Sequence, residues 1–246
     1  MFVRARKLAD DVHEAEVMAR DALAEAEMEG PPYDMFELAR RLRAKVSIVP
    51  EGTLGGPHAA CNIERREITI EDVRNDSRMH FGVAHELAHI IAGIDCQGDW
   101  EEEGFINICA GALFMPSNTF LPTVRSSSFD IAKLAKTFNA GFEPVARRIL
   151  DLRACGPDDD WPTNMLVWDD EPRHGVLPPP RGYRALACPY VSGRWYQRAM
   201  KLASAGRILR GGVYMKDVED MSVRGWWTPG GRRYVVLVWN RDPEAA

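Results

Sequence analysis

The chain has 246 residues, a formal net charge of −5 and five cysteines. This length can bury a sizeable core without disulfides, and the cysteines are odd in number, scattered and never in a C-x-x-C pair, which argues against a disulfide framework and a thiolate zinc site. No 18 uncharged apolar residues run together and the first residues carry charges throughout, which predicts a cytoplasmic protein without a membrane segment.

Charge is unevenly distributed along the chain. Residues 1–121 contain 12 lysines and arginines against 22 acidic residues, whereas residues 171–246 contain 13 against 6. A basic C-terminal part of this kind occurs in segments that face a nucleic acid or a protein partner, and also in ordinary small domains. Charge by itself therefore leaves the partner open.

The first predicted elements are helices. Apolar residues at helical spacing predict an amphipathic helix over residues 4–28, which the segment GPPYD ends, and a second helix follows over residues 35–43. Three short extended segments come next, at residues 45–50, 59–63 and 66–71. The alternation of residues in the last of them is typical of a strand, and we expect the three segments to form a small antiparallel sheet.

Helices also dominate the middle of the chain. One helix is predicted over residues 75–93, where Gly93 is its stop, and another over residues 100–115, which the segment MPSN ends. Two short helices are expected over residues 129–138 and 143–152. Their length and close spacing predict a helix-turn-helix-like segment.

Prolines, glycines and a run of acidic residues predict a domain boundary near residues 155–163. Beyond it, the segments NMLVWDD, GGVYMKDV, VRGWWTP and RRYVVLVWN indicate strands, and RWYQRAMKLASAG indicates a helix. The predicted fold class is α+β. The predicted domains are a helical domain with a small antiparallel sheet over residues 1–121, the helix-turn-helix-like segment over 122–158, and an α+β domain over 159–246.

The segment FGVAHELAHIIAG places two of the six histidines four residues apart on a predicted helix. Positions i and i+4 share one helix face, with Cβ atoms about 5–6 Å apart, so His85 and His89 can bind one metal ion. Glu86 lies beside the first histidine, where its carboxylate can reach a water on that metal, as in H-E-x-x-H metallopeptidases. Chance produces this motif in roughly one chain of this length in a hundred. Its position in an apolar helix favours the functional interpretation, because burial of unpaired imidazoles and a carboxylate is costly.

A catalytic zinc site needs a third protein ligand and an open fourth position. Glu103 lies toward the inward-facing side of the next predicted helix. Asn107 follows one turn later, where it can support a metal-binding histidine. Spacing alone leaves Glu102 as a competitor. The other polar candidates are Asp95, Cys96, Asp99 and Glu101 downstream of the motif, and His58 and His80 upstream of it.

The segments RMHFGVAHELAHII, EEEGFINICAGALFMP and IAKLAKTFNAGFEPVARRIL together resemble the ImmA/IrrE family of metallopeptidases. Members show an R-x-x-F-x-x-A-H-E-[LI]-x-H helix, followed by an E-x-x-x-N helix that ends in L-x-M-P. The similarity covers about residues 10–155, and Ala88 and Phe105 are small departures from the family pattern. The matching residues are Arg78, Phe81, Ala84, His85, Glu86, Leu87 and His89 in the first helix, and Glu103, Asn107, Leu113, Met115 and Pro116 in the second.

The resemblance implies a zincin-like fold and a zinc-dependent endopeptidase; whether manganese replaces zinc in the cell stays open. It assigns the metal ligands to His85, His89 and Glu103 and the catalytic carboxylate to Glu86, and it so favours Glu103 over Glu102. It also implies a narrow protein substrate, typically a helix-turn-helix transcriptional repressor whose cleavage switches on stress-response or mobile-element genes. Longer, IrrE-type members carry a GAF-like domain after this part, and the C-terminal α+β domain resembles one.

A second hypothesis is a non-catalytic regulator, in which the metal only holds two helices together and the basic C-terminal part binds a repressor or DNA. Direct DNA binding would use Arg147, Arg148 and Arg153 of the helix-turn-helix-like segment. The second helix of that segment is largely apolar, however, and its net charge is small for a duplex-binding element. Glu86 also argues for catalysis, because a purely structural metal site needs no general base.

Overall fold

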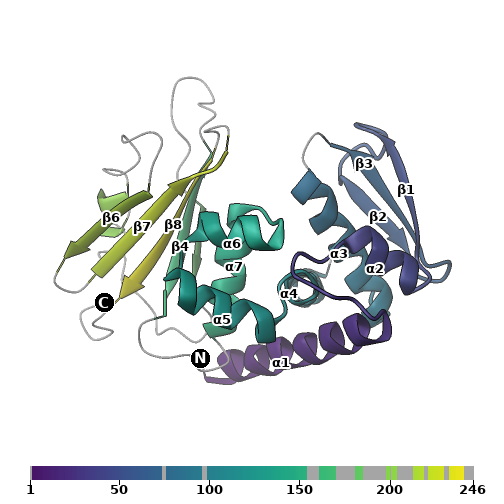
Figure 1. The fold of residues 1–246 in the computed structure, drawn as a ribbon, viewed down its shortest axis with the longest axis horizontal. Coiled ribbons are helices and arrows are strands. Elements are labelled where there is room, and N and C mark those ends of the chain that lie inside the picture. Colours follow the sequence, from purple (N-terminus) through teal and green to yellow (C-terminus); the bar gives the residue numbers. More distant parts are fainter. Residues whose placement is uncertain are drawn as a thin grey trace. The chain divides into compact units, whose positions relative to one another are not determined.

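The structure is a computed structural model of the chain (Figure 1). It describes residues 2–73, 76–95, 99–153, 161–169, 181–184, 198–199, 201–203, 213–218, 221–229 and 233–240. The chain divides into two compact units. The N-terminal unit is Ala9–Gly141, and the C-terminal unit is Phe142–Ala246 together with Met1–Leu8. The predicted domain limits at residues 121 and 158 stay predictions.

The N-terminal unit combines helices with a three-stranded sheet. The long first helix, α1 (Phe2–Glu25), belongs to this unit from Ala9 onward and buries residues at helical spacing, among them Val12, Ala15, Ala19 and Ala22. Asp34, Asp99 and Asp130 each accept two main-chain N–H groups and so cap the helices that follow them. The remaining elements are α2 (Met35–Arg41), β1 (Lys45–Pro50), β2 (Ala59–Asn62), β3 (Glu67–Asp72), α3 (Asp76–Ala92), α4 (Trp100–Phe114), α5 (Ser117–Ser127) and α6 (Ile131–Phe138).

The small sheet is mixed, and the prediction of an antiparallel sheet was wrong in this respect. Its strand order is β1-β3-β2; β2 pairs antiparallel with β3, whereas β1 pairs parallel to β3. The central strand β3 is the most buried of the three, with Ile68 and Ile70 0% and 1% exposed. The loop over residues 51–58 is long enough to carry the chain from β1 past the position of β3 to the far edge.

Helix α3 packs against β2, β3 and α4. Gly82 allows its close approach to the sheet, since a Cβ atom at this position would lie 2.9 Å from Ile70 Cδ1. The buried residues of α3 include Val83, Leu87 and Ile90. Packing on the sheet therefore fixes the rotation of α3 about its axis, and this rotation decides where its histidines point.

The sequence predicted no helix over α5, because serine, threonine and Pro122 are typical of loops. In the structure Phe120 and Val124 lie one turn apart on α5 and are fully buried. The Glu16 carboxylate of α1 accepts a hydrogen bond from the main-chain N–H of Ser117, at 3.0 Å. Tertiary packing and a cap from a distant helix thus stabilise a segment of poor intrinsic helix propensity.

The C-terminal unit contains an antiparallel sheet with strand order β5-β4-β8-β7-β6. Helix α7 packs against β4 and β8, and residues 198–199 and 201–203 are helical and place Ala199 and Ala203 in a core with Leu166, Val236 and Val238. The sequence did not predict β5, and the rest of the predicted helix over 194–206 lies outside the described residues. The elements are α7 (Phe142–Leu152), β4 (Asn164–Asp169), β5 (Arg181–Arg184), β6 (Val213–Val218), β7 (Met221–Trp227) and β8 (Arg233–Asn240).

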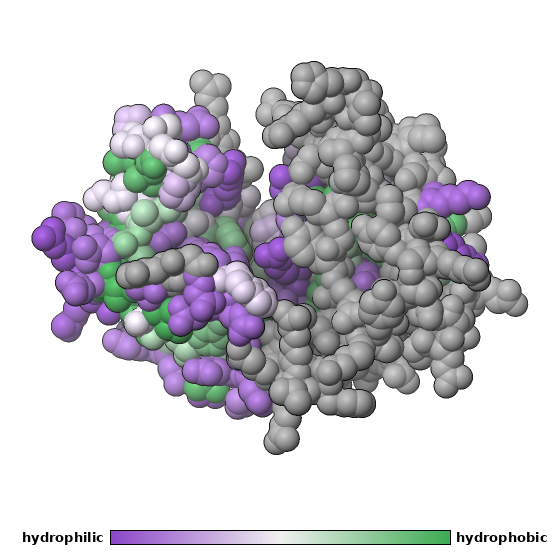
Figure 2. All heavy atoms as spheres, turned by 180° about the vertical axis from the view of Figure 1, so that it is seen from behind, coloured by the Kyte–Doolittle hydropathy of each residue, from purple (hydrophilic) through white to green (hydrophobic). Residues whose placement is uncertain are grey.

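This architecture confirms the predicted α+β class, while the GAF-like nature of the C-terminal domain stays a prediction. Among the described residues no single helix has the length and hydropathy needed to cross a membrane. Helices α4 and α5 meet those limits only when taken as a pair, and they are bent by 73° at their junction. Hydrophilic side chains cover much of the visible N-terminal unit, with hydrophobic ones between them (Figure 2).

Candidate metal centre

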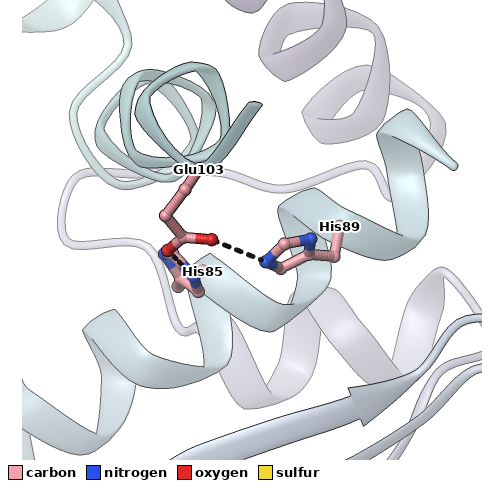
Figure 3. A group of neighbouring side chains, drawn as sticks. All are labelled: His85, His89 and Glu103. Atoms are coloured by element: carbon pink, nitrogen blue, oxygen red, sulfur yellow. Dashed lines mark ion pairs between the residues drawn. The ribbon is translucent and has the colours of Figure 1, made fainter. Parts of the chain in front are cut away.

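Three side chains from α3 and α4 point toward one another in the N-terminal unit (Figure 3). His85 Nε2 lies 3.0 Å from Glu103 Oε1, and His89 Nε2 lies 3.7 Å from Glu103 Oε2. One ligand atom from each of the three residues lies within 4.8 Å of the other two. Within the described part of the chain, this is the one cluster of three or more His, Cys, Asp or Glu side chains with such spacing.

The three residues fit a zinc ion in both chemistry and spacing. Two imidazole nitrogens and one carboxylate oxygen are a usual donor set for catalytic zinc. Ligands bound tetrahedrally at about 2.1 Å lie about 3.4 Å apart, and the two distances to the Glu103 oxygens, 3.0 and 3.7 Å, bracket that separation. The side chains of His85 and His89 are 18% and 11% exposed and that of Glu103 is 44% exposed, so solvent reaches the cluster from the Glu103 side.

Helix α3 orients both histidines, and the chain after it holds one of them. The two imidazole rings stand edge to face, with their centroids 5.0 Å apart, as expected for positions i and i+4. His89 Nδ1 lies 2.8 Å from the main-chain carbonyl oxygen of Ile94. Sequence reasoning did not find Ile94, because any residue type carries a main-chain carbonyl; the predicted helix stop at Gly93 was the only signal nearby.

Asn107 lies one turn after Glu103 on α4 and contacts residues of both helices. Its Nδ2 donates a hydrogen bond to the main-chain carbonyl oxygen of Glu103, at 2.7 Å. Its side chain also hydrogen-bonds His85, and this bond raises the pKa of that imidazole. This arrangement suits a residue that orients a metal-binding histidine.

Burial and nearby charge act in opposite directions on His85. Burial lowers the pKa of its imidazole, while the carboxylates of Glu86 and Glu103 raise it; the net shift is downward. A lowered pKa favours the neutral ring, which is the form that binds a metal. Glu86 is 8% exposed and lies outside the three-residue cluster. Its carboxylate acts on His85 through its charge, as expected for the next residue in the chain.

The other ligand candidates do not join the cluster. Glu102 and Glu101 are exposed, and Asp99 caps α4. Asp95 is also exposed and outside the cluster, and Cys96 lies outside the described residues. Of the upstream histidines, His58 Nδ1 lies 3.1 Å from Glu71 Oε2, and His80 Nδ1 accepts a hydrogen bond from the Met35 N–H, at 3.4 Å.

Two of the three arginines expected to contact DNA are instead buried or hydrogen-bonded within the C-terminal unit. Arg148 is 1% exposed, and Arg153 Nη1 donates a hydrogen bond to the carbonyl oxygen of Trp161, at 2.7 Å. Arg147 is half-buried. A fully buried guanidinium cannot contact a phosphate group, which weakens the DNA-binding hypothesis for this segment.

The comparisons with known proteins agree with the motifs. Residues 45–150 match a family model described as the IrrE N-terminal-like domain, of a peptidase family. Among solved structures, a Mycobacterium tuberculosis transcriptional regulator shares the fold, with a TM-score of 0.67 and 16% identity over 96% of this chain and 93% of that chain. No match was found among curated proteins. Because the matched segment includes α3 and α4 with their characteristic motifs, residues 45–150 are an IrrE N-terminal-like domain.

Proposed function

We propose that this protein is a zinc-dependent endopeptidase that cleaves one specific protein in the cytoplasm. The observation that carries the proposal is the convergence of His85, His89 and Glu103 from two helices, with ligand atoms within 4.8 Å of one another. Glu86 follows His85 in the chain and is buried, and in this proposal it is the general base that hydrolysis requires. A peptidase domain matched over residues 45–150 supports the same assignment.

In this proposal the two histidines and Glu103 hold the metal, and Asn107 orients His85 and the backbone of Glu103. Zinc bound there would supply Lewis-acid chemistry at the scissile carbonyl and lower the pKa of a water molecule to near neutrality. The Glu86 carboxylate takes the proton released from that water and passes it to the nitrogen of the departing peptide. Manganese is the alternative metal, since the same donor atoms also bind it.

We further propose that the substrate is a helix-turn-helix transcriptional repressor, whose cleavage switches on stress-response or mobile-element genes. The family resemblance supports this substrate, and the structural neighbour is itself described as a transcriptional regulator. The acidic N-terminal part of the chain is suited to a basic partner, as DNA-binding repressors commonly are, because opposite charges accelerate encounter.

Glu86→Gln is the decisive substitution for the chemistry. The glutamine keeps the shape of the side chain but cannot accept the proton, so we expect unchanged zinc content and loss of peptide hydrolysis. The measurement is mass spectrometry of fragments after the zinc-loaded protein is incubated with repressors encoded beside it. Glu102→Gln is the matched control, because Glu102 is exposed and outside the cluster.

The same experiment separates the peptidase from a non-catalytic regulator. A regulator would bind a repressor without producing fragments, and Glu86→Gln would leave its effect unchanged. Cleavage by the wild-type protein and by the Glu102→Gln control, together with no cleavage by the Glu86→Gln protein, supports catalysis. Cleavage by the Glu86→Gln protein at the wild-type rate would exclude the proposed mechanism.

A further inference from the structure

Helix α3 ends in a left-handed turn at Gly93. The φ angle of Gly93 is +68°, a conformation that glycine adopts easily and other L-residues rarely. The N–H groups of Gly93 and Ile94 both donate to the carbonyl oxygen of His89, at 2.9 and 3.3 Å. The chain therefore folds back over the last turn of α3 instead of continuing along the helix axis.

This turn brings a main-chain carbonyl oxygen within hydrogen-bond distance of the His89 ring. His89 Nδ1 lies 2.8 Å from the carbonyl oxygen of Ile94, which can only accept a hydrogen bond. In the neutral ring the proton must therefore be on Nδ1, and Nε2 keeps its lone pair. That same Nε2 is the atom 3.7 Å from Glu103 Oε2. The carbonyl thus selects the tautomer in which Nε2 can bind a metal.

We propose that Gly93 is a positioning residue for the metal centre, acting through the Ile94 carbonyl to hold the ring orientation and tautomer of His89. The inference rests on the proposed metal site, but it does not depend on whether the protein cleaves peptides. It assigns a positioning role at the metal site to a residue with no side chain of its own. The contribution comes from a backbone conformation that the added Cβ of another residue disfavours.

A purely structural role for Gly93 is the competing explanation, because many helices end in a left-handed glycine. The chain offers a matched control in Gly55, in the loop after β1. Gly93 and Gly55 have φ angles of +68° and +70°, and no atom lies within 4 Å of a Cβ built at either position. Alanine therefore imposes the same kind of backbone strain at both sites without a steric clash, and only Gly93 precedes the carbonyl that contacts His89.

The test compares zinc affinity of the full-length wild-type, Gly93→Ala, Gly93→Asn and Gly55→Ala proteins, measured by competition with a chromophoric chelator. Loss of an outer partner of a metal-binding histidine typically lowers affinity by about 10 to 100-fold. We expect a loss of about tenfold for Gly93→Ala and less than about twofold for Gly55→Ala. Gly93→Asn should recover most of the affinity, since asparagine tolerates the left-handed conformation.

Nitrogen-15 NMR of the imidazole rings in the metal-free protein reports the tautomer of His89, which would not change if Gly93 had a merely structural role. The wild-type and Gly55→Ala proteins should show His89 protonated on Nδ1, and Gly93→Ala a mixture of tautomers. Equal losses of zinc affinity in the two alanine variants, or wild-type affinity in Gly93→Ala, would overturn the proposal. Zinc binding by a wild-type protein that cleaves nothing would contradict the proposed function alone, whereas a wild-type protein that binds no zinc would contradict both.

Discussion

Glu103 Oε1 lies 3.0 Å from His85 Nε2, although the two residues belong to different helices. If Glu103 is the third ligand, Glu103→Ala should lower zinc affinity more than about 100-fold, because two imidazoles leave the ion under-coordinated. Glu102→Ala should change little, since that side chain points about 100° away on the same helix and is exposed. Zinc content after dialysis measures both. Loss of zinc from the Glu102 variant alone would show that the assigned ligand is wrong.

Asn107→Ala should give an intermediate loss. The substitution removes the hydrogen bonds to the Glu103 carbonyl oxygen and to His85 but leaves every ligand atom in place. We expect zinc affinity to fall about 10 to 100-fold. Chelator competition measures this change, and thermal unfolding of the metal-free proteins shows whether the fold is retained. An unchanged affinity in a folded variant would remove Asn107 from the site.

The close packing of α3 on the sheet gives a stability prediction. In Gly82→Ala the new Cβ would lie 2.9 Å from Ile70 Cδ1, so we expect a net loss of about 1–2 kcal/mol in the free energy of unfolding, even after the gain in helix propensity. Gly104→Ala is the control, because nothing lies within 4 Å of its Cβ; this variant should gain up to about 1 kcal/mol. Denaturant unfolding of the metal-free proteins measures both. A stabilised Gly82 variant would mean that α3 has room to move.

Cys109 should be inert to alkylation in the folded protein. It is 2% exposed, and burial raises the pKa of its thiol to about 12. At pH 8 its thiolate fraction is then about one in ten thousand, against about one in four for an ordinary thiol. Its reaction with iodoacetamide should therefore be slower than that of the partly exposed Cys61 and should rise about tenfold per pH unit from pH 7 to 9. Peptide mapping by mass spectrometry follows the two cysteines separately, and labelling of Cys109 as fast as Cys61 would contradict its burial.

Features that depend on local periodicity were predictable from the sequence. The i, i+4 spacing puts His85 and His89 on one face of any α-helix, so their proximity needed no tertiary information. The limits of α3 and α4 agree with the predicted ones to within a residue or so at each end, because Gly93 ends the first helix and Asp99 caps the second. The motifs on these two helices also predicted the IrrE N-terminal-like domain that the family model matches over residues 45–150.

Features that depend on which elements meet were decided by the tertiary structure. Spacing could not separate Glu103 from Glu102; the packing of α4 on α3 brings one carboxylate to the histidines and leaves the other exposed. The direction of β1 relative to β3 depends on pairing between strands distant in the chain, and the helix over α5 is stabilised by burial of Phe120 and Val124.

The end of α3 shows most clearly which features the sequence determined and which the tertiary structure decided. The sequence by itself determined that a glycine stops this helix, because only glycine adopts the left-handed turn at little cost. The tertiary structure alone decided that the turn aims the Ile94 carbonyl at His89 Nδ1. A main-chain oxygen has the same chemistry in every residue, so its role depends on where the folded chain places it.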